Sequence, residues 1–299
     1  MPDPNALAVP PSPPARPAHP QPAATVMLLR DAPTGLQVFL LRRSRQSAVL
    51  GGAYVFPGGK VENEDAGFAD SRRCDQPRAA LLANLNEPGL SMAEAARLYG
   101  AAARETLEEC GVLLAQGASR EQALQGQSLL DQGLNLDATL QRLNLRLETR
   151  ALRPWSRWIT PETPLMMNRR FDTRFFVAAL PDGQVARHDD HEASDSIWLT
   201  PREALERAWQ RDIELAPPQV MSLAHLARLR DVAAVLGEAR RHPPPTISPC
   251  PLDHAGERGT CYPGDPGHPS RQRVMPGPTR LILRQGRLEP EDGFEAFFR

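Results

Sequence analysis

One sharply delimited helix constrains the fold of this chain more than any other part of its sequence. Ser91 and Glu94 fit the capping-box pattern, in which the serine accepts a hydrogen bond from the third helical amide and the glutamate reaches back to the cap. An alanine-rich run follows, and Gly111 stands where a glycine commonly ends a helix. The pattern predicts a helix over about 92–110.

Three glutamates lie near the end of this predicted helix. At 100° per residue, Glu105, Glu108 and Glu109 fall within one arc of roughly 100°. Like charges at this spacing repel one another, so an isolated set of glutamates is usually a solvated helix face. A hard divalent cation reverses that reasoning, because Mg²⁺ prefers carboxylate oxygens and bridges readily to phosphates.

The segment upstream of the helix favours the metal interpretation. A predicted strand at 53–56 leads into Pro57-Gly58-Gly59 and then into acidic residues up to Asp65. Adjacent glycines permit close approach of the backbone, and a glycine turn presents amides toward a phosphate. We therefore expect the helix to carry the metal ligands and the glycine loop to face it.

Together these residues resemble the signature of the Nudix hydrolases, Gly-x5-Glu-x7-Arg-Glu-U-x-Glu-Glu-x-Gly-U, where U is a bulky apolar residue. Gly59 starts it, Asp65 occupies the first acidic position, and the run from Arg104 to Val112 completes it. Thr106 stands where an apolar residue is usual, and 38 residues (66–103) replace the short spacer before the arginine.

An insertion and an aspartate at this point resemble one branch, the peroxisomal-type coenzyme A and acyl-coenzyme A diphosphatases. Further segments within about 24–240 resemble that branch: Trp155-Ser-x-Trp158-Ile-Thr-Pro161, Arg169-Arg-Phe-Asp-Thr-x-Phe-Phe176, Glu192 before Trp198, and Pro217-Pro-Gln219. One departure concerns the substrate, because Ala48 stands where a coenzyme A signature has an arginine.

The resemblance implies the α/β/α Nudix sandwich, an α/β fold with a mixed sheet, and hydrolysis of a diphosphate linkage. The implied substrate is a small nucleotide-containing molecule, coenzyme A or acyl-coenzyme A, cleaved to 3′,5′-ADP and (acyl-)phosphopantetheine. Two alternatives stay open: a Nudix hydrolase of ADP-ribose or a dinucleotide, and a catalytically silent Nudix-like binding module. A mutually repelling glutamate trio argues against the silent module.

The resemblance also assigns residues to roles. The implied ligands of one or more Mg²⁺ or Mn²⁺ ions are Glu105, Glu108, Glu109 and the carbonyl of Gly59. Arg104 is expected to orient Glu62 or Asp65. Glu192 is the candidate general base or extra ligand, with a solvated acidic loop as the alternative.

Substrate contacts are expected from Gly58 and Gly59 and from Arg169 and Arg170, although these arginines are equally compatible with a solvated strand edge. Trp155 and Trp158 either stack on an adenine or belong to the core. A zinc site formed by Cys250, His254, Cys261 and His268 is disfavoured, because the spacing fits no common finger.

The predicted organisation has three parts. Residues 1–22 form a flexible proline-rich arm, 23–240 a Nudix domain, and 241–299 a proline- and glycine-rich extension ending in a hairpin at 280–288. The domain has an irregular insertion at 66–90 and a helical one at 113–160 that, with the C-terminal segments, forms a lid or a pocket wall. Its other predicted elements are strands at 24–30, 36–42, 171–180 and 196–199, and helices at 119–131, 136–148, 201–210 and 218–240.

Composition limits the partners and the location. The formal net charge of −1 provides no basic field for nucleic acid or an anionic membrane, so we expect neither partner. The 4 cysteines are scattered, which favours reduced thiols. No export signal is evident, and Phe297-Phe298-Arg299 is not a peroxisomal tripeptide, so we expect a cytoplasmic protein. The oligomeric state stays open.

Overall fold

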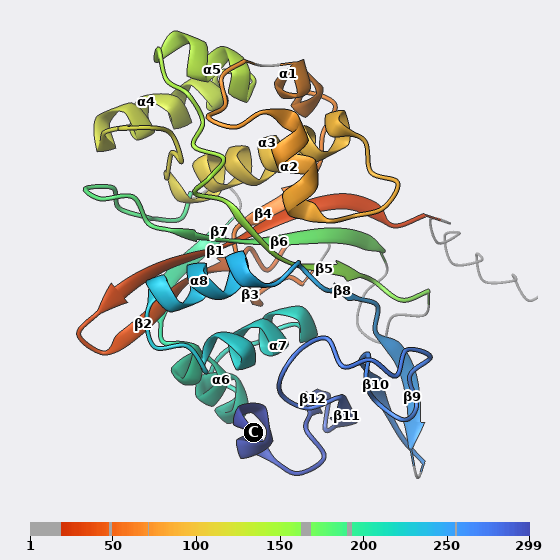
Figure 1. The fold of residues 1–299 in the computed structure, drawn as a ribbon. Helices are drawn as coiled ribbons and strands as arrows, with labels where there is room; N and C mark the ends of the chain where they lie inside the picture. Colours follow the sequence, from red (N-terminus) through yellow and green to blue (C-terminus); the bar gives the residue numbers. More distant parts are fainter. Residues whose placement is uncertain (1–18, 48–49, 71, 163–168, 190–192, 255) are drawn as a thin grey trace, which may run out of the picture.

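The computed structural model describes residues 19–47, 50–70, 72–162, 169–189, 193–254 and 256–299. Within these ranges the centre of the molecule is a mixed sheet of eight strands (Figure 1). Its main path is β3-β2-β1-β6-β5-β8, while β4 pairs with β1 and β7 pairs with β2. β1 runs parallel to β6 and β5 parallel to β8, and the other pairs are antiparallel. The strands are β1 (Gln21–Ala32), β2 (Gly35–Arg43), β3 (Tyr54–Val55), β4 (Gly58–Lys60), β5 (Arg153–Ile159), β6 (Phe171–Ala179), β7 (Ala193–Leu199) and β8 (Thr246–Ile247).

Strand β1 shows why this sheet is covered on both faces. Successive side chains of a strand point to opposite faces, and here both sets are apolar and fully buried. Ala24, Val26 and Leu28 belong to a hydrophobic cluster on one face. Met27 and Leu29 belong to a second cluster on the other face. The predicted α/β/α sandwich is therefore confirmed.

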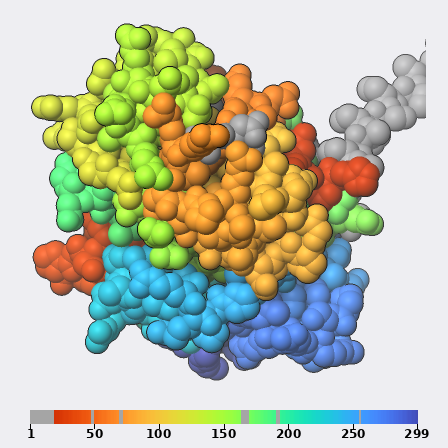
Figure 2. All heavy atoms as spheres, turned by 45° about the horizontal axis from the view of Figure 1, so that its top comes forward, coloured from red at the N-terminus to blue at the C-terminus, as the bar shows by residue number. Residues whose placement is uncertain are grey.

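Two helical layers enclose the sheet (Figure 1). The first layer faces the viewer in Figure 2, coloured from orange to yellow-green. It contains α1 (Asp65–Asp70), α2 (Arg78–Leu85), α3 (Met92–Cys110), α4 (Arg120–Asp131) and α5 (Leu136–Arg142). The second layer contains α6 (Pro201–Gln210), α7 (Pro217–Leu226) and α8 (Val232–Arg241).

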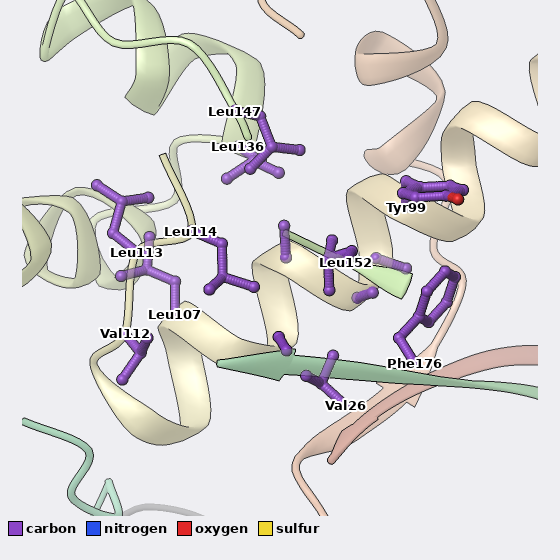
Figure 3. Close-up of a cluster of buried hydrophobic side chains, with 14 of the residues drawn as sticks. Val26, Tyr99, Leu107, Val112, Leu113, Leu114, Leu136, Leu147, Leu152 and Phe176 are labelled. Atoms are coloured by element: carbon purple, nitrogen blue, oxygen red, sulfur yellow. The ribbon is translucent and has the colours of Figure 1, made fainter. Parts of the chain in front are cut away.

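Helix α3 has the ends that its sequence predicts. Ser91 Oγ accepts from the Glu94 amide at 3.2 Å, and the Ser91 amide donates to the Glu94 carboxylate at 2.8 Å. Gly111 ends the helix with φ of 64°, and its amide donates to the Leu107 carbonyl. Leu107 and Val26 lie in the buried cluster that joins α3 to the sheet (Figure 3). This anchoring fixes the end of α3 where the glutamates lie.

The predicted irregular insertion at 66–90 is wrong in part, because it contains most of α1 and all of α2. The helices are short, of 6 and 8 residues, so each offers only about two turns in which a helical period could show. Phe68 of α1 and Leu81 of α2 are almost completely buried. Phe68 packs on Gly100 of α3, where a Cβ atom would lie only 2.9 Å from its ring. The close contact between Gly100 and Phe68 therefore holds α1 against α3 without a long apolar stripe.

The predicted helical insertion at 113–160 also needs correction. α4 is confirmed, but α5 ends at Arg142 and not near residue 148, because Asn144 adopts a left-handed conformation with φ of 53°. The segment Arg153–Ile159 is strand β5, between β6 and β8 in the sheet. Its side chains are buried on both faces, so the alternation that marks a strand is weak.

The single helix predicted at 218–240 is two helices, α7 and α8. The apolar stripe continues through both, but Asp231 starts a new helix by accepting from the Ala234 amide at 2.7 Å. Asp31, at the end of β1, accepts from the Val232 amide at 2.9 Å. A tertiary contact therefore fixes the break.

The extension at 241–299 contains more structure than its composition predicts. β8 joins the main sheet, and a second sheet has the order β12-β11-β10-β9. Its strands are β9 (Cys250–His254), β10 (Glu257–Cys261), β11 (Arg280–Arg284) and β12 (Arg287–Glu289), and a short helix, η1 (Phe294–Phe298), follows. The hairpin predicted at 280–288 is confirmed as β11 and β12. Pro251 fits a strand here because β9 lies at the sheet edge.

Both ends of the chain bear on the predicted boundaries. The proline-rich arm predicted at 1–22 lies outside the described residues up to residue 18, and β1 begins at Gln21. Tyr262 and Leu281 of the extension share a hydrophobic cluster with Leu223 of α7. In the described ranges, no helix combines the length and apolarity needed to cross a bilayer.

Candidate active site

Arg104 is the centre of a buried polar network at the end of α3. Its Nε donates to Asp65 Oδ1 at 3.0 Å, and its Nη1 donates to Glu108 Oε2 at 2.7 Å. Nη2 donates to the Lys60 carbonyl at 3.0 Å, and Glu105 Oε1 lies 3.0 Å from Nη1. The contact expected between Arg104 and Asp65 is thus present, although residues 66–103 separate them in sequence.

Gly58 and Gly59 lie directly against the glutamates. They form strand β4 with Lys60, paired to β1, so the glycine loop expected from the sequence is in fact a short strand. The Gly58 amide donates to Glu109 Oε2 at 2.8 Å. A Cβ atom on Gly59 would lie 2.2 Å from Glu105 Oε1. Glycine is therefore required at this position for Glu105 to approach the backbone.

Burial dominates the electrostatics of this group. It raises the pKa of Glu105, against the lowering effect of Arg104, and the charges of Glu109 and Glu108 raise it further. Burial likewise raises the pKa of Glu108. Burial alone would lower the pKa of Arg104, but its bond to Asp65 and the neighbouring glutamates raise it above the ordinary value. One buried cation thus holds several carboxylates together.

The side chains as placed do not form a closed ligand set. Across the described part of the chain, no three His, Cys, Asp or Glu side chains are grouped so as to hold a metal ion. The reason is visible here: Arg104 engages Glu105 and Glu108, while Glu109 accepts from Gly58. The donors are nevertheless the hard oxygens that Mg²⁺ and Mn²⁺ prefer, on one helix turn beside the two glycines of β4.

A cavity of about 440 Å³ lies next to strand β4, but Arg104, Glu105, Glu108 and Glu109 are not among its lining residues. Gly58, Gly59 and Lys60 of β4 line it, together with Thr25 of β1 and Thr173 of β6. A further part of its wall comes from the start of α7 and from the C-terminal extension, through Pro217, Pro218, Gln219, Pro249, Pro251, Thr260 and Leu288. The expectation that C-terminal segments form a pocket wall is confirmed.

The other predicted site residues are distributed unevenly. Arg169 is exposed and lines the cavity, whereas Arg170 is absent from its lining and donates from Nε to the Thr160 carbonyl at 3.2 Å. Glu192 and Ala48 lie outside the described residues. Trp155 packs against His225, with ring centroids 4.6 Å apart, and belongs to the core.

Several residues of the cavity were not predicted from the sequence. Gln219 is buried, with 7% of its surface exposed, and Lys60 and Arg43 lie at the cavity margin. The run Pro217-Pro218-Gln219 was noted as a motif, but nothing in the sequence assigned it a role. A wall from the C-terminal segments was expected, but its individual residues could not be identified from the sequence, because strands of a separate small sheet supply them.

The zinc site that the sequence disfavours cannot be followed in full, because the side chain of His254 lies outside the described residues. Cys250 and Cys261 face each other across β9 and β10, and both are free thiols. His268 Nε2 lies 2.9 Å from the Ser248 carbonyl oxygen, so this ring is held by the main chain.

Comparison with known proteins decides the family. The model described as the NUDT19 Nudix domain matches residues 15–226, which is more than half of the chain. The chain belongs to the NUDT19 Nudix domain family. This Nudix match contains β4, α3 and the start of α7, but it ends before the C-terminal wall of the cavity.

Relatives of this Nudix chain carry the same family name. Acyl-coenzyme A diphosphatase NUDT19 of Gallus gallus is 31% identical over 257 residues, which cover 70% of this chain and 68% of that protein. The Xenopus laevis protein of the same name is 28% identical over 231 residues, so the alignment covers 66% of this chain but only 61% of the frog protein.

A solved structure supports the same Nudix fold. The NUDIX hydrolase from Alicyclobacillus acidocaldarius is 26% identical and superposes with a TM-score of 0.55. The superposition covers 73% of this chain and 96% of the bacterial chain. The Nudix architecture of the main sheet and its helices therefore rests on an independent structural likeness.

Proposed function

We propose that this Nudix hydrolase is a divalent-metal-dependent diphosphatase acting on coenzyme A or acyl-coenzyme A. Water would attack a phosphorus of the diphosphate to give 3′,5′-ADP and (acyl-)phosphopantetheine. Two relatives named acyl-coenzyme A diphosphatase NUDT19 support this substrate class. The observation that carries the proposal is the packing of Glu105 and Glu109 against Gly58 and Gly59, because these two glycines also line the cavity.

The residues present fit a hard divalent cation in their chemistry. The ligands of Mg²⁺ or Mn²⁺ would be Glu105, Glu108, Glu109 and the carbonyl of Gly59. Glu105 and Glu108 would have to leave Arg104 in order to bind the ion. Such an ion offsets the negative charge of a diphosphate and lowers the pKa of bound water. Arg104 keeps Asp65 beside the helix, and Lys60 and Arg169 bring positive charge to the cavity margin.

Glutamate variants test this proposal directly. The protein is incubated with coenzyme A, acyl-coenzyme A and ADP-ribose in Mg²⁺ or Mn²⁺, and the phosphate-containing products are identified. We expect Glu108→Gln and Glu109→Gln to lower kcat by roughly 10²-fold or more, since each removes a charged ligand. Glu121→Gln, on the exposed first turn of α4, is the matched control.

Each result decides between the alternatives. Full activity in both glutamate variants would remove the metal helix from the reaction. Hydrolysis of ADP-ribose without hydrolysis of coenzyme A would favour the other nucleoside diphosphate substrates. Absence of turnover on every substrate with either metal would favour a silent binding module.

A further inference from the structure

The lining of the cavity combines two chemically different sets of side chains. Arg43, Lys60 and Arg169 place three cationic residues in its lining, together with the two glycines of β4. The remaining wall is largely apolar, including Phe56, Trp158, Phe171, Phe175, Pro217, Pro218, Pro249, Pro251 and Leu288. A ligand that matches both sets joins a strongly anionic group to a mainly apolar one.

Gln219 is an exception within the apolar wall. Its side chain is more than nine-tenths buried, and among the described residues its Oε1 has no hydrogen-bond partner. It follows two prolines at the start of α7, so it carries the first main-chain N–H of that helix, and the cap residue Ala216 offers no side-chain acceptor. Both features point to a polar group supplied from outside the chain.

A second buried glutamine shows what a structural amide looks like in this fold. Gln184 is 5% exposed, and its oxygen accepts from the Leu113 amide at 2.9 Å. Its nitrogen donates to the carbonyls of Leu113 and Ala118 at 3.0 and 3.2 Å. A buried amide without such partners is costly to the fold, because burial removes its bonds to water. Gln219 therefore lacks the compensation that Gln184 has.

We propose that Gln219 and the C-terminal wall bind the apolar, amide-bearing arm of the substrate, which is the (acyl-)pantetheine side of the diphosphate. This inference rests on the proposed function and adds a binding site to it. Pantetheine carries secondary amides along a narrow chain, so one of them pairs with Gln219 while the chain crosses Pro251 and Leu288. The diphosphate then pairs with the cationic side chains of the lining, on the side of Gly58 and Gly59.

The aromatic side chains of the cavity favour the arm over the adenine base. Trp158 is only 4% exposed, and its ring already packs against Phe175 and Tyr262, with centroids 6.3 and 5.9 Å away. Its Nε1 donates to Ser156 Oγ. A base needs an open aromatic face for stacking, whereas prolines and aliphatic side chains suit a flexible chain.

Binding of the two reaction products distinguishes a site for the pantetheine arm from a site for the adenine base. Calorimetric titrations with 4′-phosphopantetheine and with 3′,5′-ADP compare the wild type with Gln219→Leu. We expect the variant to bind phosphopantetheine roughly 5- to 50-fold more weakly and 3′,5′-ADP within about twofold of the wild type. Weakened binding of 3′,5′-ADP alone, or unchanged binding of both products, would overturn the proposal.

Thermal unfolding without ligand separates binding from a structural role. Gln219→Leu is expected to leave Tm unchanged or to raise it, because no hydrogen bond is lost. Gln184→Leu, the matched buried glutamine, is expected to lower Tm clearly because three hydrogen bonds are lost. A drop in Tm for Gln219→Leu as large as that for Gln184→Leu would make Gln219 a structural residue.

The C-terminal wall has its own test. Pro251 is exposed at the edge strand β9 and lines the cavity, so Pro251→Trp adds bulk there with little disturbance. We expect kcat/KM for long-chain acyl-coenzyme A to fall at least fivefold more than that for coenzyme A. Pro243→Trp, exposed and outside the cavity lining, is the control. Equal effects on both substrates would overturn the placement of the arm against this wall.

Failure of the inference differs from failure of the proposed function. An active coenzyme A diphosphatase whose Gln219→Leu variant binds both products normally would refute the inference alone. A wild type that turns over none of the diphosphates would refute the function, whatever the product titrations give.

Discussion

Gly58 and Gly59 are neighbours in β4, but each excludes a side chain for a different reason. A Cβ atom at Gly58 would lie 2.4 Å from the Ala24 carbonyl oxygen, which is backbone and cannot move away. Its φ of 153° also strains any residue with a Cβ. At Gly59 the obstacle is the end of the Glu105 side chain. The absence of a side chain thus makes room for the backbone of β1 at Gly58 and for the Glu105 carboxylate at Gly59.

These two glycines give a paired prediction. Gly58→Ala is expected to lower the free energy of unfolding by about 2–4 kcal/mol, because the backbone of β1 must shift. Gly59→Ala is expected to cost less stability but to reduce kcat by roughly tenfold or more, because it displaces Glu105. Chemical denaturation and coenzyme A hydrolysis are measured for both variants. Equal losses of stability in the two would contradict the distinction.

At the scale of elements, helix α7 carries a histidine whose ring is only partly exposed and is neutral. His225 packs on Trp155, and burial lowers its pKa to about 4. Above its ordinary pKa of 6.5 the ring is neutral in both the folded and the unfolded chain, so it does not affect stability there. As pH falls toward 4, only the unfolded chain takes up the proton, and the folded state loses stability.

This histidine predicts an acid-sensitive contribution to stability. Between pH 7 and pH 5 the free energy of unfolding is expected to fall by about 1–2 kcal/mol because of His225. In His225→Gln that part of the pH dependence should disappear, while the contributions of other groups stay. Urea denaturation of both proteins at the two pH values gives the comparison. An identical pH dependence in wild type and variant would exclude His225 as its source.

Elements differed in how far the sequence could predict them. Helix α3 was predicted within a residue, because Ser91, Glu94 and Gly111 mark its ends locally. The break between α7 and α8 could not be predicted from the apolar stripe, since Asp31 from a distant strand stabilises it. β5 lacks a visible period because both of its faces are buried.

The residues of the site likewise differ in how far the sequence could predict them. Glu105, Glu108, Glu109 and Arg104 could be predicted, because one helix turn brings them together whatever the rest of the chain does. Gln219 and the cavity wall at Pro251 could not, because they meet through tertiary packing between α7 and the C-terminal sheet. The roles of all these residues stay predictions until the variants are measured.

At the scale of the whole molecule, the C-terminal extension is packed into the main fold. Tyr262 is fully buried and lies edge-on to Trp158 of β5, with ring centroids 5.9 Å apart. Arg228, just after α7, donates to the carbonyls of Phe297 and Phe298. We therefore expect the extension and the Nudix sheet to unfold together.

Substitution of Tyr262 tests this coupling. Tyr262→Ala is expected to lower the free energy of unfolding by about 3–5 kcal/mol, as for other large buried aromatics, in one cooperative transition. Tyr262→Phe is the control, since the hydroxyl has no partner among the described residues and its loss should be neutral or stabilising. Calorimetry that resolves a separate, early transition for the extension would contradict the coupling.

The ion pair between Arg104 and Asp65 has a consequence for how this motif can vary. It joins the two ends of a 38-residue segment at 3.0 Å, so the halves of the signature meet in space although the chain departs between them. The entropy of closing a loop grows only slowly with its length. Segments of very different length can therefore occupy this position, provided that a carboxylate and a guanidinium form an ion pair at their two ends. A sequence search that requires a fixed spacing between the halves of the signature would miss such relatives.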